Sequence, residues 1–284
     1  MANVTSSVTS AAIADVVSSM VTETLIQESV LIPTITDFSG MVGPGLDRLS
    51  IPRSTALAVQ TVSESAALTP AAPTVSADTL LLDKNQAIDF RLTDIAALQT
   101  TPDMLGWIVR DAMKSLPAAV DDVICAQIVA ASASTPDHRI QLSGTGNIEV
   151  TIADILGAQK LLNEARVPQQ DRYMLINPNQ QLVLLQIAAL QNANTFGSRE
   201  AYQNGFLMEL FGFKIVMTTS SALADDEVVF YHKSAVGFAR QMSTKFRVQE
   251  QAFAHAVDYS LSQIFGSILL DGGGRAVLYN NDGL

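Results

Sequence analysis

Charge is scarce in this chain. Only 16% of its 284 residues are Asp, Glu, Lys or Arg, where a soluble domain usually carries about a quarter. The 17 basic and 28 acidic residues give a formal net charge of −11, which argues against a nucleic-acid-binding protein with a basic face. Hydrophobic residues make up 48%, too many for an intrinsically disordered chain. Low charge with ample apolar area predicts that much of the surface is buried against other copies.

Cysteine and leader signals are equally sparse. The single cysteine, Cys125, allows neither an intrachain disulfide nor a cysteine metal cluster, and we expect a buried, inert thiol in a reducing compartment. The first basic residue is Arg48, so residues 1–47 do not fit a secretory signal, which needs positive charge ahead of its apolar stretch. No apolar run approaches the roughly 18 residues that span a bilayer. Synthesis in the cytoplasm and no membrane partner are therefore expected.

The common catalytic motifs are missing as well. The sequence has no Gly-Lys of a phosphate-binding loop, no Gly-x-Ser-x-Gly and no His-Glu-x-x-His. We interpret Asp121-Asp122 as the solvated face of a helix, Asp225–Glu227 as a turn before a strand and Gly272–Gly274 as a flexible turn. The three histidines lie far apart in sequence: His138, His232 and His255. The sequence therefore predicts no catalytic residue, no metal site and no cofactor.

Hydrophobic periodicity predicts a mixed fold in the first half of the chain. Apolar residues at three-to-four spacing indicate an amphipathic helix over residues 10–28. Between residues 46 and 92, apolar residues at even positions from Leu80 to Leu92 indicate strands. Residues 102–133 favour a long helix, and Pro117 inside it predicts a kink or two abutting helices.

The second half alternates between helices and strands. Residues 134–146 are expected to form a loop, and residues 191–205 a polar, Asn-rich one. Thr151 is the expected N-cap of a helix over 152–166, and Asn177-Pro178 starts another. The remaining segments are expected to be strands, or helical or extended at 261–270: 173–176, 211–217, 228–232, 233–257, 261–270 and 276–279. This mixture predicts an α+β fold.

Two segments resemble a known family. Residues 151–178 combine a helix, Val167-Pro168, a polar turn, Arg172, an apolar strand and Pro178, and residues 204–216 read Asn-Gly followed by Gly-Phe-x-Ile-Val. They are similar to tailed-bacteriophage major capsid proteins, as is the closing stretch from Tyr259 through Phe265-Gly266 to Arg275-Ala-Val-Leu. The resemblance implies the Hong Kong 97-like capsid fold: an N-arm, an extended E-loop β-hairpin, a P-domain with a long spine helix and an α/β A-domain.

The resemblance also implies a division of the chain and a set of partners. The expected segments are the N-terminal arm 1–45, E-loop hairpin 46–92, P-domain with spine helix 93–150, A-domain 151–232, P-domain return strands 233–258 and A-domain closing segment 259–284. The expected product is a non-catalytic icosahedral shell of hexamers and pentamers in the virion. It would enclose double-stranded DNA without sequence-specific binding. A separate scaffolding protein, a portal and a decoration protein are candidate partners.

The hairpin 46–92 is the expected clasp on a neighbouring subunit, because an isolated two-stranded hairpin is marginally stable in water. Its candidate contact residues are Arg53, Leu57, Val59, Glu64, Leu68 and Val75. A second set lies in the loop 191–205, which the resemblance places near capsomer axes: Asn192, Asn194, Arg199 and Asn204. Lys84, the only lysine between Gly45 and Leu92, is expected near the hairpin base, which predicts a shell without Lys–Asn cross-links.

Two other functions stay open on sequence grounds. An encapsulin, the shell of a bacterial compartment that houses enzymes, resembles phage capsid proteins in fold. A metal-dependent small-molecule enzyme would use one of the acidic clusters, against which the missing motifs count.

Overall fold

The computed structural model describes residues 29–43, 45–54, 75–94, 104–133, 138–187, 209–251, 253–270 and 274–281. The predicted helix 10–28, the loop 191–205 and most of the turn 272–274 lie outside these residues. So do the first two residues of the predicted long helix 102–133, Pro102 and Asp103.

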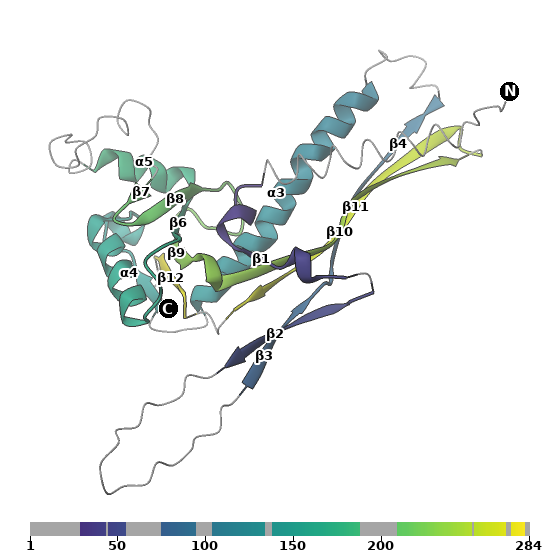
Figure 1. Cartoon of the computed structure of the whole chain (residues 1–284). Coiled ribbons are helices and arrows are strands. Elements are labelled where there is room, and N and C mark those ends of the chain that lie inside the picture. Colours follow the sequence, from purple (N-terminus) through teal and green to yellow (C-terminus); the bar gives the residue numbers. More distant parts are fainter. Residues whose placement is uncertain are drawn as a thin grey trace, which may run out of the picture.

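Three sheets organise the described part of the chain (Figure 1). The six-stranded sheet has the order β5-β12-β9-β6-β8-β7, the four-stranded sheet β1-β10-β11-β4, and β2 and β3 form a separate pair. The strands are β1 (Thr36–Asp37), β2 (Arg48–Ser54), β3 (Val75–Leu81), β4 (Lys84–Thr93), β5 (Arg139–Gln141), β6 (Arg172–Ile176), β7 (Glu209–Leu210), β8 (Phe213–Met217), β9 (Val228–His232), β10 (Val236–Gln251), β11 (Ala256–Leu269) and β12 (Ala276–Asn280).

The long helix α3 (Met104–Ala133) joins the two larger sheets. Its buried residues Leu116, Val120 and Ile124 pack with Leu175 and Val229 of the six-stranded sheet. The same cluster contains residues of the four-stranded sheet, namely Val236, Phe238 and Phe265. One core therefore runs along the helix and binds both sheets to it.

Pro117 lies inside α3, yet the structure has one continuous helix and not two abutting ones. A proline removes one backbone hydrogen bond and crowds the preceding turn. Leu116 and Val120, which flank the proline, are both buried in the core. Tertiary packing on both sides of the proline thus holds the helix together.

Two shorter helices cover the other face of the six-stranded sheet. Helix α4 (Ile152–Glu164) begins with a capping box, in which the Thr151 side chain accepts from the Asp154 N–H and Asp154 accepts from the Thr151 N–H. Helix α5 (Pro178–Gln186) begins at Asn177, whose side chain accepts from the Gln180 N–H. Both starts were predicted from the same residues. α4 ends two residues before the expected Arg166, which has a positive φ of 55°.

The strands of the six-stranded sheet alternate between two cores. Met174 and Ile176 of β6 pack with the α4 cluster, while Leu175 packs with the α3 cluster. In β9, Phe230 packs with the α4 cluster and Tyr231 packs with the α3 cluster. This period of two, buried on both faces, is the arrangement expected of a central sheet with helices on either side.

The hairpin is shorter than the predicted range 46–92. Only β2 and β3 pair with each other, from Arg48–Leu81 to Ser54–Val75. Strand β4 instead pairs along its whole length with β11. After the break at Leu82 and Asp83, Lys84 and Gln86 interrupt the pattern, but even-numbered apolar residues return in the same phase at Ile88. Periodicity alone therefore does not separate β3 from β4.

Two further segments differ from the sequence-based expectation, and a third takes one of its two expected forms. The predicted loop 134–146 contains the short strand β5, which pairs in parallel with β12. The predicted strand 211–217 is β8 and begins two residues later, at Phe213, because Phe211 and Gly212 have positive φ and form the turn that joins β7 to β8. The stretch 261–270 is extended and belongs to β11, which follows β10 after a turn within the predicted β region 233–257.

Candidate assembly surfaces

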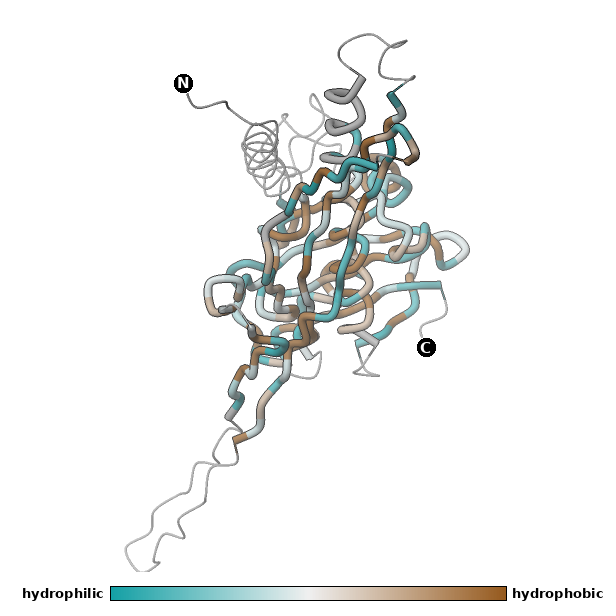
Figure 2. Tube along the Cα trace, turned by 90° about the vertical axis from the view of Figure 1, so that its right-hand side faces the viewer, coloured by the Kyte–Doolittle hydropathy of each residue, from teal (hydrophilic) through white to brown (hydrophobic). Residues whose placement is uncertain are grey.

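The β2–β3 ribbon projects from the body of the molecule (Figures 1 and 2). Its seven residue pairs form a sheet with no third strand among the described residues. Arg53 pairs with Ser76, next to the pair of Ser54 and Val75 at the outer end. The side chain of Val75 is 68% exposed and that of Leu81 51%. The ribbon therefore shows apolar side chains to the solvent when the subunit is alone.

The base of the ribbon is fixed to the four-stranded sheet. Leu80 and Leu82 are buried in one cluster with Ala239 of β10. Close contact at this point needs a glycine, since a Cβ on Gly266 of β11 would lie 2.0 Å from the carbonyl oxygen of Leu81. The Leu82 N–H also donates to the Asp47 carbonyl at 3.0 Å. The ribbon is thus held at its base and exposed further out.

The N-terminal segment is anchored by Asp121 of α3. The Asp121 carboxylate accepts hydrogen bonds from the Ser29 hydroxyl at 2.6 Å and from the N–H groups of Val30 and Leu31 at 2.9 and 3.3 Å. Burial raises the pKa of Asp121 above its usual value, although these hydrogen bonds act in the opposite direction. The prediction of a solvated acidic face is wrong for Asp121, because the incoming segment covers this part of the helix.

The next residues continue this attachment into the core. Leu31 and Ile35 are buried with the α3 residues, and the Thr34 hydroxyl lies 2.7 Å from the Tyr231 hydroxyl of β9. Strand β1 then pairs in parallel with β10, Thr36 opposite Gly237. Residues 29–37 are therefore part of the folded body.

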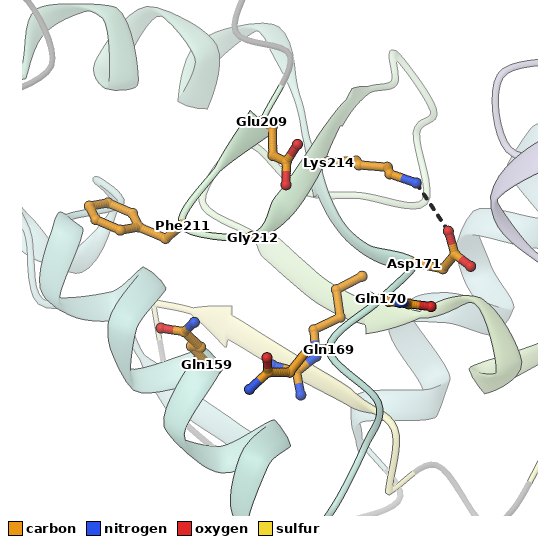
Figure 3. Close-up of a pocket in the computed structure, with 9 residues that line it drawn as sticks. Gln159, Gln169, Gln170, Asp171, Glu209, Phe211, Gly212 and Lys214 are labelled. Atoms are coloured by element: carbon orange, nitrogen blue, oxygen red, sulfur yellow. Dashed lines mark hydrogen bonds and ion pairs between the residues drawn. The ribbon is translucent and has the colours of Figure 1, made fainter. Parts of the chain in front are cut away.

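A polar cleft of about 420 Å³ lies between α4 and the β7–β8 hairpin (Figure 3). Lys214 and Asp171 point toward each other across one side, 3.0 Å apart. The Lys214 ammonium holds the pKa of Asp171 below its usual range, and Asp171 raises the pKa of Lys214. The described lining residues include no histidine, cysteine, serine or threonine. The lining thus offers none of the hydroxyl, thiol and imidazole groups that form Ser–His or Cys–His nucleophile pairs.

The residues considered for chemistry have ordinary structural partners. His138 Nδ1 lies 2.9 Å from the Ala276 carbonyl oxygen, and His232 Nδ1 lies 2.7 Å from the Ser234 hydroxyl. Asp225–Glu227 form a turn before β9, as predicted, in which the Glu227 carboxylate accepts from the Ala224 N–H. Cys125 is buried, and burial raises the pKa of its thiol to about 11.

The described residues contain neither a candidate metal-binding cluster nor a candidate membrane-spanning helix. No group of three or more His, Cys, Asp or Glu side chains there is placed to hold a metal ion. Of the helices the structure describes, none is long and apolar enough to cross a bilayer.

A known protein family matches more than half of the chain. The sequence profile described as "Phage capsid protein" matches residues 105–276, which include α3 after its first residue, all of β10 and β11, and the six-stranded sheet except for β12 beyond Ala276. The chain belongs to the phage capsid protein family. It is accordingly a structural subunit of a virion shell built from many copies of itself. No curated protein sequence matches the chain.

Solved structures agree with this capsid assignment at the level of the fold. A chain from Mycobacterium phage Che8 superposes with a TM-score of 0.72 at 21% identity, covering 90% of this chain and 92% of that one. The capsid of cyanophage P-SCSP1u gives 0.65 at 18% identity, covering 87% and 86%. The mature capsid of bacteriophage PhiM1 gives 0.67 at 9% identity, covering 90% and 88%. The fold is Hong Kong 97-like, as the resemblance implied.

The comparisons favour the phage capsid over the encapsulin alternative. Of the predicted contact residues in this capsid protein, the structure describes Arg53 and Val75, which it brings close together at the outer end of the ribbon. The others lie outside the described residues: Leu57, Val59, Glu64, Leu68, Asn192, Asn194, Arg199 and Asn204. The sequence did not identify Asp121 as the residue that anchors the N-terminal segment. It also did not identify Gly266 as the residue whose missing Cβ leaves room for the base of the β2–β3 ribbon.

Proposed function

We propose that this capsid protein forms its shell by laying the β2–β3 ribbon on a neighbouring subunit. The observation that carries the proposal is the uncovered apolar surface of the ribbon: Leu80 is buried at the base, while Leu81 beside it is 51% exposed and Val75 near the outer end is 68% exposed. A two-stranded ribbon alone is marginal in water. A neighbour's surface would cover the outer part and stabilise both molecules.

The partners in this proposal come from the resemblance to tailed-phage capsid proteins, and the charge of the chain is consistent with them. The subunits would form hexamers and pentamers, and the net charge of −11 suits a container that must not hold packaged DNA at many points. A separate scaffolding protein, a portal and a decoration protein belong to the same proposal, as do synthesis in the host cytoplasm and the absence of catalysis. Lys84 lies in β4 opposite Phe265, away from the outer ribbon, which supports a shell without lysine cross-links.

The experiment shortens the ribbon without touching its base. Ser54 and Val75 are directly opposite each other, so replacing residues 55–74 by Asn-Gly would close β2 and β3 with a two-residue turn. The design replaces residues 55–74 and not residues 63–78, because a deletion of 63–78 would remove the first four residues of β3. We expect the shortened subunit to keep its circular dichroism and cooperative melt. Sedimentation should show at least a tenfold loss of closed shells.

A second variant separates chain length from contact chemistry. Replacing Leu57, Val59, Leu68 and Val75 by serine keeps the full length and should also lower the shell yield. Normal shells from both variants would contradict the proposal that the ribbon lies on a neighbouring subunit. Loss of the cooperative melt in the shortened variant would show that the outer ribbon belongs to the subunit's own fold.

A further inference from the structure

The far end of the four-stranded sheet carries a fully exposed phenylalanine. Strands β10 and β11 run away from the six-stranded sheet and meet at a turn (Figure 1). Phe253 in this turn has a relative exposure of 105%, the highest among the large hydrophobic residues that the structure describes. Transfer of a phenyl ring from water into an apolar environment is favourable in proportion to the area covered, so a fully exposed phenylalanine gains most from being covered.

The turn that presents Phe253 has a defined geometry. The Ala254 N–H donates to the Gln251 carbonyl at 3.0 Å, which closes a four-residue turn around Phe253. His255 follows with a positive φ of 45°, and its carbonyl accepts from the Asp94 N–H at 2.9 Å. The turn is thus tied to the end of β4 as well as to its own hairpin. An aromatic side chain on such a turn loses little backbone entropy when it is bound.

Stacked aromatic rings brace the strands behind the turn. The ring of Tyr259 on β11 lies 5.1 Å from that of Phe90 on β4 and 5.8 Å from that of Phe246 on β10. The interplanar angles are 15° and 24°. Cross-strand aromatic contacts of this kind stabilise a sheet. The three strands therefore hold the end of the sheet, and Phe253 with it, in one position.

Charge makes this end suitable for contact between like molecules. The chain as a whole carries a formal charge of −11, whereas the paired strand ends, residues 89–94 and 245–258, contain three basic and four acidic residues. Copies of an acidic protein repel each other least where their surfaces are close to neutral. The end of the sheet is such a place.

We propose that Phe253 is an anchor residue that inserts into an apolar surface of a second copy of this chain during shell assembly. The proposal rests on the proposed function, because it needs the assembled shell, but it concerns a contact separate from the β2–β3 ribbon. Aromatic residues at the centre of an interface commonly carry a large share of the binding free energy. Phe253 fits this role because it is rigidly presented, apolar and uncovered in the subunit.

The test uses the protein's lack of other reactive thiols. The native Cys125 is buried and its pKa is about 11, so a Phe253→Cys variant has one accessible thiol, and wild type is the matched blank. Shells are assembled from purified wild type with about a tenth of the variant, so that assembly does not depend on the variant itself. We expect maleimide to label the introduced thiol at least tenfold more slowly in shells than in free subunits.

Equal labelling rates in shells and subunits would overturn the proposal. Protection that appears only after another virion protein is added would overturn the choice of a second copy as the partner. Failure of wild type to form any assembly would instead contradict the proposed function. Phe253→Leu should retain shell formation and Phe253→Ser should lower it by at least tenfold, with unchanged thermal melting of both subunits.

Discussion

The single carboxylate of Asp121 attaches the N-terminal segment to helix α3. This carboxylate bonds to Ser29, 92 residues earlier in the chain, and to two backbone N–H groups beside it. The sequence contains only an Asp-Asp pair on a helix, which resembles a solvated face. The partner is distant in sequence and offers backbone N–H groups, so no residue pattern identifies it. Long-range polar contacts of this kind are absent from local sequence rules.

We predict that Asp121→Ala destabilises the subunit by about 2–4 kcal/mol, because it leaves buried hydrogen-bond donors without an acceptor. Asp122→Ala is the matched control, since Asp122 is the neighbouring acid and is only half-buried. Urea unfolding measures both. Equal, small effects for the two variants would show that Asp121 does not anchor the segment.

At the scale of elements, the sequence predicts best where a local signal and burial agree. Helix α4 starts at the expected Thr151, because the capping residues lie within four positions of each other. Strand β9 has the predicted bounds, since its run of apolar residues is buried on both faces. By contrast, the division of β3 from β4 depends on which strand each one pairs with. Phe253 gives no pattern either, because exposure of a single apolar residue depends on the turn around it.

The close contact between Gly266 and the base of the β2–β3 ribbon gives a second prediction. Gly266→Ala would place a Cβ 2.0 Å from the Leu81 carbonyl oxygen, so the backbone at the end of β3 must move. We expect a loss of about 1–3 kcal/mol in stability, typical of overpacking, and a lower shell yield because the ribbon is redirected.

The control for this substitution is Gly40→Ala, where an added Cβ meets no atom within 4 Å and φ is not positive. Thermal melting and sedimentation of both variants compare the two sites. A Gly266→Ala variant with the melting temperature and shell yield of the control would mean that the ribbon adapts to the added methyl group.

The whole molecule is an acidic subunit that must pack against copies of itself. A formal charge of −11 and a sequence pI near 4.6 mean that neighbouring copies repel each other at neutral pH. Screening shortens that repulsion, from a range of about 30 Å at 10 mM salt to about 8 Å at 150 mM. We predict that the shell yield of the purified protein, measured by light scattering, rises over this range.

A fall in yield with added salt would contradict this prediction and would indicate that opposite charges dominate the contacts between subunits. Neutral sucrose at matched osmolality is the control, since it changes the solvent without screening charge. The ion pairs in the described subunit are exposed, Arg91 with Asp258 and Lys214 with Asp171 among them. Exposed pairs of this kind contribute little to stability, so salt should affect association more than folding.

The place of residues 29–37 sets the timing of folding during synthesis. These residues leave the ribosome early, yet Thr34 meets Tyr231, 197 residues later, and Thr36 pairs with Gly237. At about 5–20 residues per second, the segment waits on the order of 10–40 s for its partners. Strand β4 waits slightly less, because its partners in β11 lie closer in sequence, from Thr93 opposite Ala256 to Lys84 opposite Phe265. The four-stranded sheet therefore closes only after β11 has been synthesised through Leu269, and a shorter nascent chain cannot offer the finished edges of this sheet to a growing shell.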